Sequence, residues 1–408
     1  MDMDSKPGGQ QMLMARQPIF DQHQKVVAYE LLYRLEDSPA PGVAGAELSG
    51  EMILSVYTSI SDAGAVRRVP AFLPVGRELL LSGALPELPL KQVVIELDPG
   101  PKPDADYDRA ALRLMKEGYR ICLRGLSYNP RYDNLLKMAQ IVKLDVREFS
   151  ESALAGQLES IRPFKVAFLA EGIDEFSQLE RCIDMGFKLY QGGFLSKPKL
   201  VEGRRVSANQ VTMMQLIQEL QSPVATPEKL EALILRDPVL TFKLLRIVNS
   251  AAYSLVRKVD SIAQAVVLLG LEQVRKWATL IAMSANGDKP EELSRLLLIR
   301  GRMCERVAEG LKQPNAPSYF IAGMMSGLHA MLDIRQDAML DQVPLGEDIK
   351  DAIRAGSGPI GAVLANVIHY ESGDWHLLPP DFDANLYERA YRESLKWTQE
   401  SMQAMHEE

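Results

Sequence analysis

The pattern of apolar residues changes near residue 200, and this change constrains the fold more than any other feature. Before it, short apolar runs rich in β-branched residues alternate with segments of helical period. After the polar segment 196–210, which carries Pro and Gly, the strand-like runs stop. At 408 residues the chain is long enough for two or three domains. We therefore expect two domains, residues 12–203 and 204–408.

Alternation of strands and helices in the first domain predicts a parallel sheet. Helical stretches such as 107–118 and 176–186 separate the candidate strands. Roughly seven or eight such strands fit a closed barrel, so the expected fold is a TIM-like (β/α) barrel. The candidate strands are 25–34, 71–75, 92–97, 120–123, 141–146, 165–171 and 189–195.

The second domain has helical spacing almost throughout and is expected to be all-helical. Examples are EKLEALIL, DPVLTFKLLRIVNS and PIGAVLANVIHYE. Asp237 followed by Pro238 predicts a helix start, with Asp at the N-cap and Pro at the first helical position. The fold class is thus α/β plus all-α.

Composition and charge narrow the location and partners of the protein. No run reaches the eighteen or so apolar residues of a membrane span, and the start, MDMDSKPGGQQ, lacks the basic and apolar parts of a secretory signal. We therefore expect a cytoplasmic protein without membrane attachment. A net charge of −8 argues against nucleic acid as a partner, because binding to DNA depends on Lys and Arg neutralising phosphates.

The three cysteines, Cys122, Cys182 and Cys304, are odd in number and far apart. Such cysteines are typical of small buried hydrophobic residues in a reducing compartment, not of a disulfide framework or a zinc site.

Polar and charged residues stand at the predicted carboxyl ends of the barrel strands. In a β/α barrel these ends carry the chemistry, so they define the candidate site. The residues at these positions are Glu30, Arg34, Pro74, Glu96, Asp98, Arg124, Gly125, Lys143, Asp145, Glu171, Asp174 and Gln191.

Several of these residues lie in segments that resemble EAL cyclic di-GMP phosphodiesterases. ELLYR resembles the E-x-L-x-R signature of that family, KLD its K-I-D strand, AEGID its A-E-G-V-E segment and QGGFLSKP its closing Q-G-Y segment. The match is collinear over nearly 190 residues. The resemblance implies an EAL barrel and a pocket that in the family holds two divalent metals.

The same comparison shows departures at the metal-ligand positions. Pro74 replaces a family Asn, Arg124 and Gly125 replace paired aspartates, and Asp174 replaces a Glu. Two hard cations need several oxygen ligands, and Arg adds a permanent positive charge. We therefore expect a vestigial pocket with no metal, no cofactor and no catalytic residue, in a protein that is not an enzyme.

Without a metal, Glu30, Glu96 and Glu171 would form a cluster of like charges. We hypothesise that Arg124 extends into the vacated site and pairs with one or more of these glutamates, taking the place of the metal cation. Two alternatives stay open: Arg124 points into solvent, or it binds a phosphate of an intact nucleotide.

The opening of the second domain resembles HDOD domains, which read D-P-x-L-x-x-K-L-L-R-x-x-N-S and then I-x-x-A-x-x-x-L-G. The matching residues are Asp237, Pro238, Leu240, Lys243, Leu244, Leu245, Arg246, Asn249, Ser250, Ile262, Ala265, Leu269 and Gly270. The later text resembles the HDOD subgroup fused to EAL domains, the YuxH-type EAL-HDOD proteins.

HDOD domains are related to HD-type metal phosphohydrolases, which need a His-Asp pair. In this register Ser326 and Gly327 replace the pair. The chain has five His, and none shows metal-ligand spacing; His329 and His369 are expected to be partly buried helix residues.

These observations predict a bacterial signal-transduction protein related to cyclic di-GMP, acting through protein–protein interaction in motility, biofilm formation or stress regulation. The first alternative is a receptor that binds cyclic di-GMP without cleaving it, weakly because the metals are missing. The second is an active phosphodiesterase with an unusual metal site. The partner is not identified, and a homodimer contact through the amphipathic last helix stays open.

Overall fold

The computed structural model describes residues 12–35, 49–50, 53–54, 57–58, 69–101, 103–197, 215–221, 226–235, 238–249, 259–284, 290–343 and 345–406. The expectations for residues 1–11, for most of the segment 196–210, and for Asp237 and Ser250 lie outside these residues. The chain divides into two compact units. One contains Met1–Phe194 and His369–Glu388, and the other contains Leu195–Ile368 and Arg389–Glu408.

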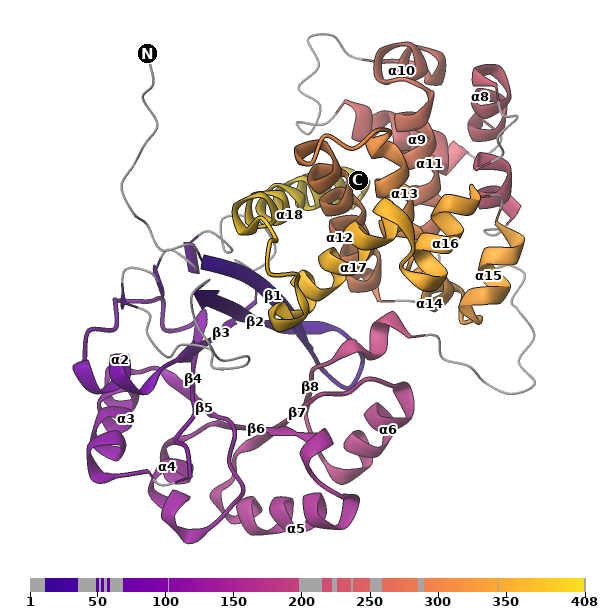
Figure 1. The fold of residues 1–408 in the computed structure, drawn as a ribbon. Coiled ribbons are helices and arrows are strands. Elements are labelled where there is room, and N and C mark those ends of the chain that lie inside the picture. The colour runs from indigo at the N-terminus through magenta and orange to yellow at the C-terminus, as the bar shows by residue number, and fades with distance from the viewer. Residues whose placement is uncertain are drawn as a thin grey trace, which may run out of the picture. The chain divides into compact units, whose positions relative to one another are not determined.

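The first unit contains a closed barrel whose strands are joined in chain order (Figure 1). Strands β2 to β8 run parallel, whereas β1 runs antiparallel to both of its neighbours, β2 and β8. The strands are β1 Met12–Phe20, β2 Val26–Leu35, β3 Ala71–Val75, β4 Val93–Leu97, β5 Arg120–Leu123, β6 Ile141–Asp145, β7 Ala167–Glu171 and β8 Leu189–Tyr190. The predicted barrel is confirmed.

Strand β1 was not predicted from the sequence, and its composition explains why. MLMARQPIF holds one β-branched residue, Ile19, so it lacks the enrichment that usually marks a strand. The strand forms because it pairs along its whole length with β2, from Met12 opposite Leu35 to Phe20 opposite Val26.

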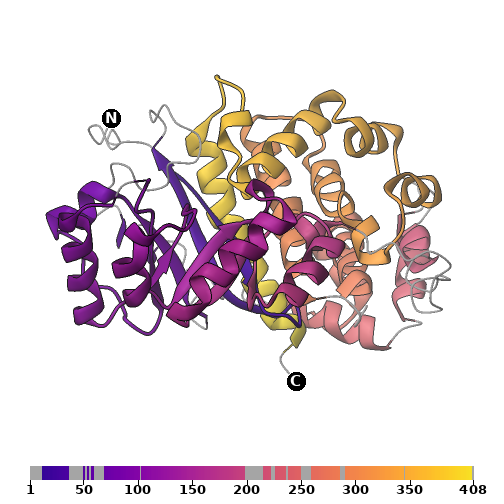
Figure 2. The ribbon, with the colours of Figure 1, turned by 90° about the horizontal axis from the view of Figure 1, so that it is seen from below.

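Helices cover the outer face of this barrel (Figures 1 and 2). Their ends are set locally: Asp104 caps α3 through the backbone N–H of Tyr107, and a capping box of Glu175 and Gln178 starts α6. The helices are α2 Arg77–Ser82, α3 Ala105–Glu117, α4 Asp133–Met138, α5 Glu151–Ile161 and α6 Phe176–Met185. Short 3-10 turns are η2 Pro130–Tyr132, η3 Val146–Glu148, η4 Arg162–Phe164 and η5 Gly193–Ser196.

The barrel interior is layered, and the layering places the candidate site. Side chains two positions apart on a strand point to the same face, so the residue two places after a core residue also points inward. In strand after strand, an apolar core residue is followed two places later by a candidate site residue. The pairs are Ala28 and Glu30, Phe72 and Pro74, Val94 and Glu96, Cys122 and Arg124, Ile141 and Lys143, Leu169 and Glu171, and Leu189 and Gln191.

The second unit is all-helical in the part that the structure describes, as predicted. Helices α12 and α13 cross closely at two glycines: a Cβ added to Gly323 would lie 2.8 Å from the Cα of Gly301. The helices are α8 Pro227–Leu235, α9 Pro238–Val248, α10 Ile262–Leu269, α11 Leu271–Ser284, α12 Glu291–Gly310, α13 Ala316–Met325, α14 Leu328–Leu332, α15 Gln336–Gln342 and α16 Glu347–Ala355. The unit also contains α17 Gly358–Ser372 up to Ile368 and α18 Ala384–His406 from Arg389.

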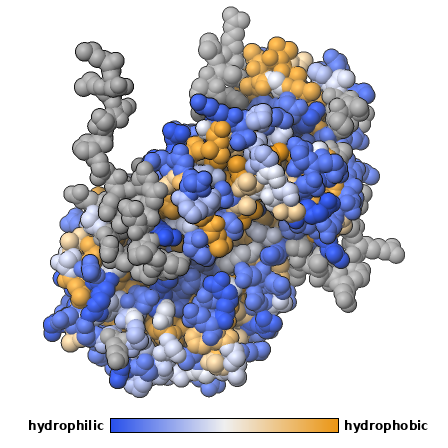
Figure 3. Space-filling model, in the orientation of Figure 1, coloured by the Kyte–Doolittle hydropathy of each residue, from blue (hydrophilic) through white to orange (hydrophobic). Residues whose placement is uncertain are grey.

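Large apolar side chains are exposed on α9 and α10 of the second unit. Val267 is 84% exposed and Leu268 and Phe242 are each 58% exposed. Figure 3 shows apolar surface over α10. The three cysteines, in contrast, are free and buried, as predicted.

The segment His369–Glu388 packs with the barrel, although it lies far along the chain. It comprises the end of α17, the short turn η6 Trp375–Leu377 and the start of α18. The sequence-based division at 203/204 placed this segment with the helical domain; that division stays a prediction, and the packing groups the segment otherwise.

None of the helices that the structure describes combines the length and the apolar character that crossing a membrane requires.

Candidate functional site

Lys143 lies at the centre of the acidic layer inside the barrel mouth. Its ammonium Nζ is 2.7 Å from Glu30, 3.4 Å from Glu96 and 3.4 Å from Glu171. The lysine side chain is fully buried on β6, and the three carboxylates come from β2, β4 and β7. Sequence reasoning named Lys143 as a site residue but did not identify it as the main counterion of the cluster.

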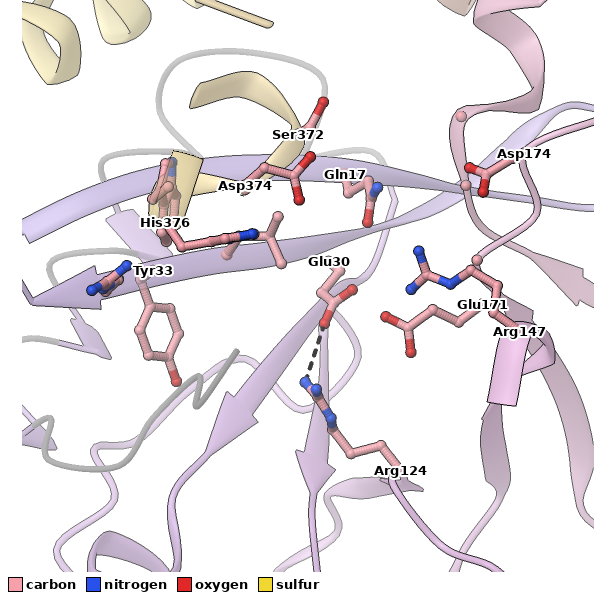
Figure 4. A pocket seen from close by; sticks show the side chains of 17 residues that line it. Gln17, Glu30, Tyr33, Arg124, Arg147, Glu171, Asp174, Ser372, Asp374 and His376 are labelled. Atoms are coloured by element: carbon pink, nitrogen blue, oxygen red, sulfur yellow. Dashed lines mark ion pairs between the residues drawn. The ribbon is translucent and has the colours of Figure 1, made fainter. Parts of the chain in front are cut away.

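Arg124 follows β5 and extends into the same layer. Its guanidinium Nη1 is 3.2 Å from Glu96 Oε1 and 3.8 Å from Glu30 Oε1. Figure 4 marks the pair with Glu30. The hypothesis that Arg124 pairs with the glutamates is confirmed, and the alternative that it points into solvent is wrong. The physical reason is that a guanidinium makes stronger hydrogen bonds to carboxylates than to water. In addition, the buried carboxylates would be strongly destabilising without a cation beside them.

Three carboxylates share this layer with two cations, so full ionisation would leave one excess negative charge. Burial, followed by repulsion from Glu30, raises the pKa of Glu96 to about 7. Burial also raises the pKa of Glu171. Burial acts on Glu30 as well, but the attraction of Lys143 and Arg124 outweighs it and lowers the pKa of Glu30. The extra proton of the cluster therefore belongs mainly on Glu96.

The surroundings of Glu96 fit this protonation. Its second oxygen, Oε2, is buried and has no hydrogen-bond partner among the described residues. An unpartnered buried oxygen is more tolerable on a neutral carboxyl than on a carboxylate. Lys143, by contrast, stays charged, because the attraction of the three carboxylates outweighs burial and raises the pKa of its ammonium.

The family resemblance implies two divalent metals, and the donor set at this site does not fit them. Lys143 and Arg124 already occupy the inner faces of the carboxylates. Pro74 and Gly125 supply no side-chain oxygen, and the described residues contain no group of three or more His, Cys, Asp or Glu side chains placed to hold a metal ion.

Gly125 has a backbone conformation that explains its identity. Its φ is +62°, and an added Cβ would lie 2.9 Å from Asp98 Oδ2. A side chain at this position would be strained by its backbone and would displace Asp98.

Gln191 ties three strands together below the mouth. Its side-chain amide donates to Glu30 Oε2 at 2.5 Å and to Gln17 Oε1 at 2.7 Å. Tyr33 of β2 donates to the backbone oxygen of Pro74. Glu30 Oε2 is thus held by Gln191 together with Lys143, whose Nζ is 2.7 Å away.

Asp145, predicted as part of the pocket, binds its neighbour instead of the carboxylate cluster. Its two oxygens accept from Arg147 Nε at 2.9 Å and Arg147 Nη2 at 2.7 Å. Burial opposes ionisation, but these hydrogen bonds outweigh it and lower the pKa of Asp145. Asp145 thereby orients Arg147 at the rim of the mouth.

A cavity of about 380 Å³ opens above this layer. It gathers residues that sequence reasoning named and residues that it missed. The named residues are Glu30, Arg34, Arg124, Glu171 and Asp174. The missed residues with polar or aromatic side chains are Gln17, Tyr33, Arg147, Ser372, Asp374, Trp375 and His376.

Different reasons explain the omissions. Gln17 lies on β1, which carries no strand signal, whereas Tyr33 and Arg147 adjoin motif residues and could have been found from them. Residues 372–376 carry no sequence signal that links them to the barrel, because only the packing of the chain brings them there.

The position of the His-Asp pair in the second unit is filled by packing. Arg300 Nη1 donates to Ser326 Oγ at 2.9 Å, and a Cβ added to Gly327 would lie 2.3 Å from Leu297 Cδ2. His329 on α14 is half-buried, as expected, and burial lowers its pKa.

Comparison with known proteins agrees with both halves. The model of the HDOD domain matches residues 208–348. The chain is 30% identical over 404 residues to cyclic di-GMP phosphodiesterase CdgJ of Vibrio cholerae, covering 95% of this chain and 92% of CdgJ. It is 27% identical over 407 residues to uncharacterized protein YuxH of Bacillus subtilis, covering 96% of this chain and 99% of YuxH.

Solved structures similar to part of the chain include a standalone EAL protein from Vibrio cholerae O395 with bound cyclic di-GMP. That match has a TM-score of 0.36 and 16% identity and covers 47% of this chain and 91% of the other. The phosphodiesterase PaMucR in complex with cyclic di-GMP matches with a TM-score of 0.35 and 19% identity, covering 49% of this chain and 99% of the other. These TM-scores are too low to support an argument.

The relationship to CdgJ corrects one prediction. The sequence predicted that the chain is not an enzyme, and this is wrong: a relative that is 30% identical over nearly its whole length is named a phosphodiesterase. The prediction treated the replacements at positions 74, 124 and 125 as decisive, although the glutamates of β2, β4 and β7 still converge at the mouth. With its HDOD match and two relatives aligned along nearly the whole chain, this protein belongs to the YuxH-type EAL-HDOD family, which includes CdgJ and YuxH.

Proposed function

We propose that this protein acts in cyclic di-GMP signalling by binding the nucleotide in the cavity at the barrel mouth. The observation that carries the proposal is that Arg34, Arg124 and Arg147 line one cavity while Lys143 balances the acidic floor from below. The name of the relative CdgJ supports cyclic di-GMP as the ligand.

The charges at the mouth suit a ligand with separated anionic groups. Cyclic di-GMP carries two phosphodiesters, each with one negative charge, and guanidinium groups bind phosphate oxygens with paired hydrogen bonds. Arg124 binds two buried carboxylates, those of Glu30 and Glu96, whereas the side chain of Arg147 is 57% exposed at the rim of the mouth. We therefore assign the phosphates to Arg147 and to Arg34, which lines the same cavity.

Titration calorimetry with cyclic di-GMP tests the proposal. Saturation at about 10 µM or below supports it. Arg34→Gln is expected to weaken binding by roughly tenfold or more, because a charge-assisted hydrogen bond contributes about 1.5 to 3 kcal/mol. Arg109→Gln is the matched control, since Arg109 is an exposed residue of α3 paired with Asp106 and outside the cavity. Equal affinities for the two variants would contradict the assigned site.

Hydrolysis of the bound nucleotide is a second candidate function, favoured by the phosphodiesterase relative. The measurement is chromatographic detection of the linear dinucleotide after incubation with cyclic di-GMP and Mg²⁺ or Mn²⁺. Product that disappears in Glu30→Gln would assign hydrolysis to this site. Action through a protein partner stays a prediction, which a pull-down with the full chain tests.

A further inference from the structure

The wall of the cavity that faces β2 is built by residues from the far end of the chain. Ser372, Gly373, Asp374, Trp375 and His376 line the cavity together with Glu30 and Arg34. All of them belong to the same compact unit as the barrel. We call residues 372–376 the C-terminal wall. Figure 4 shows Asp374 between His376 and Gln17, on the side of the mouth that faces Glu30.

An aromatic cluster anchors this wall. Tyr370 is fully buried and lies 6.2 Å from Trp375 and 6.1 Å from Tyr387 between ring centroids. Phe382 packs against Tyr387 at 4.9 Å. Trp375 Nε1 donates to the backbone oxygen of Tyr370 at 3.0 Å, so the turn is closed by its own hydrogen bonds.

The wall is also tied directly to the barrel. Tyr370 Oη accepts from the backbone N–H of Met14 on β1 at 3.4 Å. Gly373 has a φ of +78°, and an added Cβ would lie 2.7 Å from Leu32 Cδ1 on β2. The backbone therefore approaches the strand as closely as glycine permits, and the wall is positioned before any ligand binds.

Asp374 presents an unused acceptor pair to the cavity. Its side chain is exposed, and among the described residues nothing pairs with its carboxylate. Asp174, a second acid that lines the cavity, lies close enough to the Arg147 guanidinium to attract it electrostatically. Among the described residues, Asp374 thus differs from the other acids of the cavity, each of which interacts with a cation.

A carboxylate with two unpaired oxygens has the hydrogen-bonding pattern that fits guanine. The Watson–Crick edge of guanine offers two adjacent donors, N1–H and the N2 amino group, which a carboxylate accepts in a bidentate pair. The corresponding edge of adenine places an acceptor, N1, beside its amino donor, and that acceptor repels a carboxylate.

We propose that Asp374 recognises a guanine base of the bound nucleotide and that the C-terminal wall makes the site selective for guanine over adenine. This inference rests on the proposed function, since it assigns a base contact within the same cavity. It makes the C-terminal half of the chain part of the ligand site, which an isolated barrel would lack.

The test compares cyclic di-GMP with cyclic di-AMP by titration calorimetry on the full chain. Wild type is expected to prefer cyclic di-GMP. Asp374→Asn is expected to weaken cyclic di-GMP binding roughly tenfold or more and to narrow the preference, because a bidentate base contact discriminates on that scale and an Asn amide can pair with adenine. Asp381→Asn removes the same charge from an exposed position of the same segment outside the cavity and should leave both affinities unchanged.

Each of the other outcomes contradicts either the assignment of Asp374 to guanine or the proposed function. If Asp374→Asn raises affinity for both nucleotides equally, Asp374 merely repels the phosphates and the base assignment fails. If Asp374→Asn leaves both affinities unchanged while wild type binds, the assignment also fails and the proposed function stands. If wild type binds neither nucleotide, the proposed function falls together with the inference. Thermal denaturation of the variants, expected to match wild type, excludes misfolding as the cause of weaker binding.

Discussion

At the scale of single residues, the barrel mouth depends on Lys143. The sequence supplies three glutamates at inward positions of the strands β2, β4 and β7. Their shared buried layer would be unstable with all three ionised and no cation present. Lys143 and Arg124 turn this cluster into a nearly neutral network. Removing one partner of a buried ion pair leaves an uncompensated charge, which is far more destabilising than the pair itself is stabilising.

Lys143→Met is therefore expected to lower the free energy of unfolding by about 3 to 5 kcal/mol near neutral pH. The loss should shrink at pH 5, where the carboxyls take up protons. Urea denaturation at the two pH values measures it. Lys137→Met, the same change on an exposed residue of α4, should stay within about 0.5 kcal/mol of wild type. If Lys143→Met also lowers the free energy of unfolding by only about 0.5 kcal/mol, Lys143 is not the counterion that balances the three glutamates.

The raised pKa of Glu96 predicts how the stability of the protein changes with pH. Its pKa is raised to about 7 in the folded protein, from 4.5. Between these values the unfolded chain releases the proton while the folded one keeps it, so stability falls as pH rises through this window. The stability of wild type relative to Glu96→Gln should decrease by roughly 3 kcal/mol from pH 4.5 to pH 7. A difference that is flat across this range would show that Glu96 is ionised in the folded state.

At the scale of elements, the turn η6 and the strand β2 are held together by a glycine. Gly373 brings the C-terminal wall against Leu32, and both its positive φ and its missing Cβ are needed. At Gly373 the turn is thus matched to the surface of β2 by shape.

Gly373→Ala is expected to destabilise the protein more than Gly356→Ala does. Both residues have positive φ, +78° and +65°, so backbone strain destabilises both variants by about 1 kcal/mol. Only the alanine at 373 collides with Leu32, since nothing lies within 4 Å of a Cβ at 356. Thermal denaturation of the pair measures the collision, and equal losses would mean that the wall does not lie on β2.

At the scale of the whole molecule, the compact units do not follow the order of the chain. The unit that contains the barrel also contains His369–Glu388, which the sequence assigned to the helical domain. The buried rings of Tyr370 and Tyr387 therefore help to stabilise the unit that contains the barrel.

A polypeptide of residues 1–203 should consequently be less stable than one in which residues 369–388 are joined to it by a flexible linker. The added segment buries aromatic side chains, and burying each such ring contributes roughly 1.5 to 3 kcal/mol. Circular dichroism melting curves of the two polypeptides provide the comparison. Equal melting temperatures would show that the segment does not stabilise the barrel.

The sequence by itself determined the β/α barrel, the helical second half and the charged residues at the strand ends, because strand and helix periodicities and the motif residues are local properties of the chain. It also placed Glu30, Glu96, Arg124 and Glu171 in one layer, since residues at the carboxyl ends of parallel strands must meet. Only the tertiary structure decided that Lys143 is the central counterion, that β1 closes the barrel in the antiparallel direction and that residues 372–376 form a wall of the cavity. These depend on contacts between distant segments of the chain, such as that of Met14 with Tyr370, which are 356 residues apart, and no local pattern encodes such contacts.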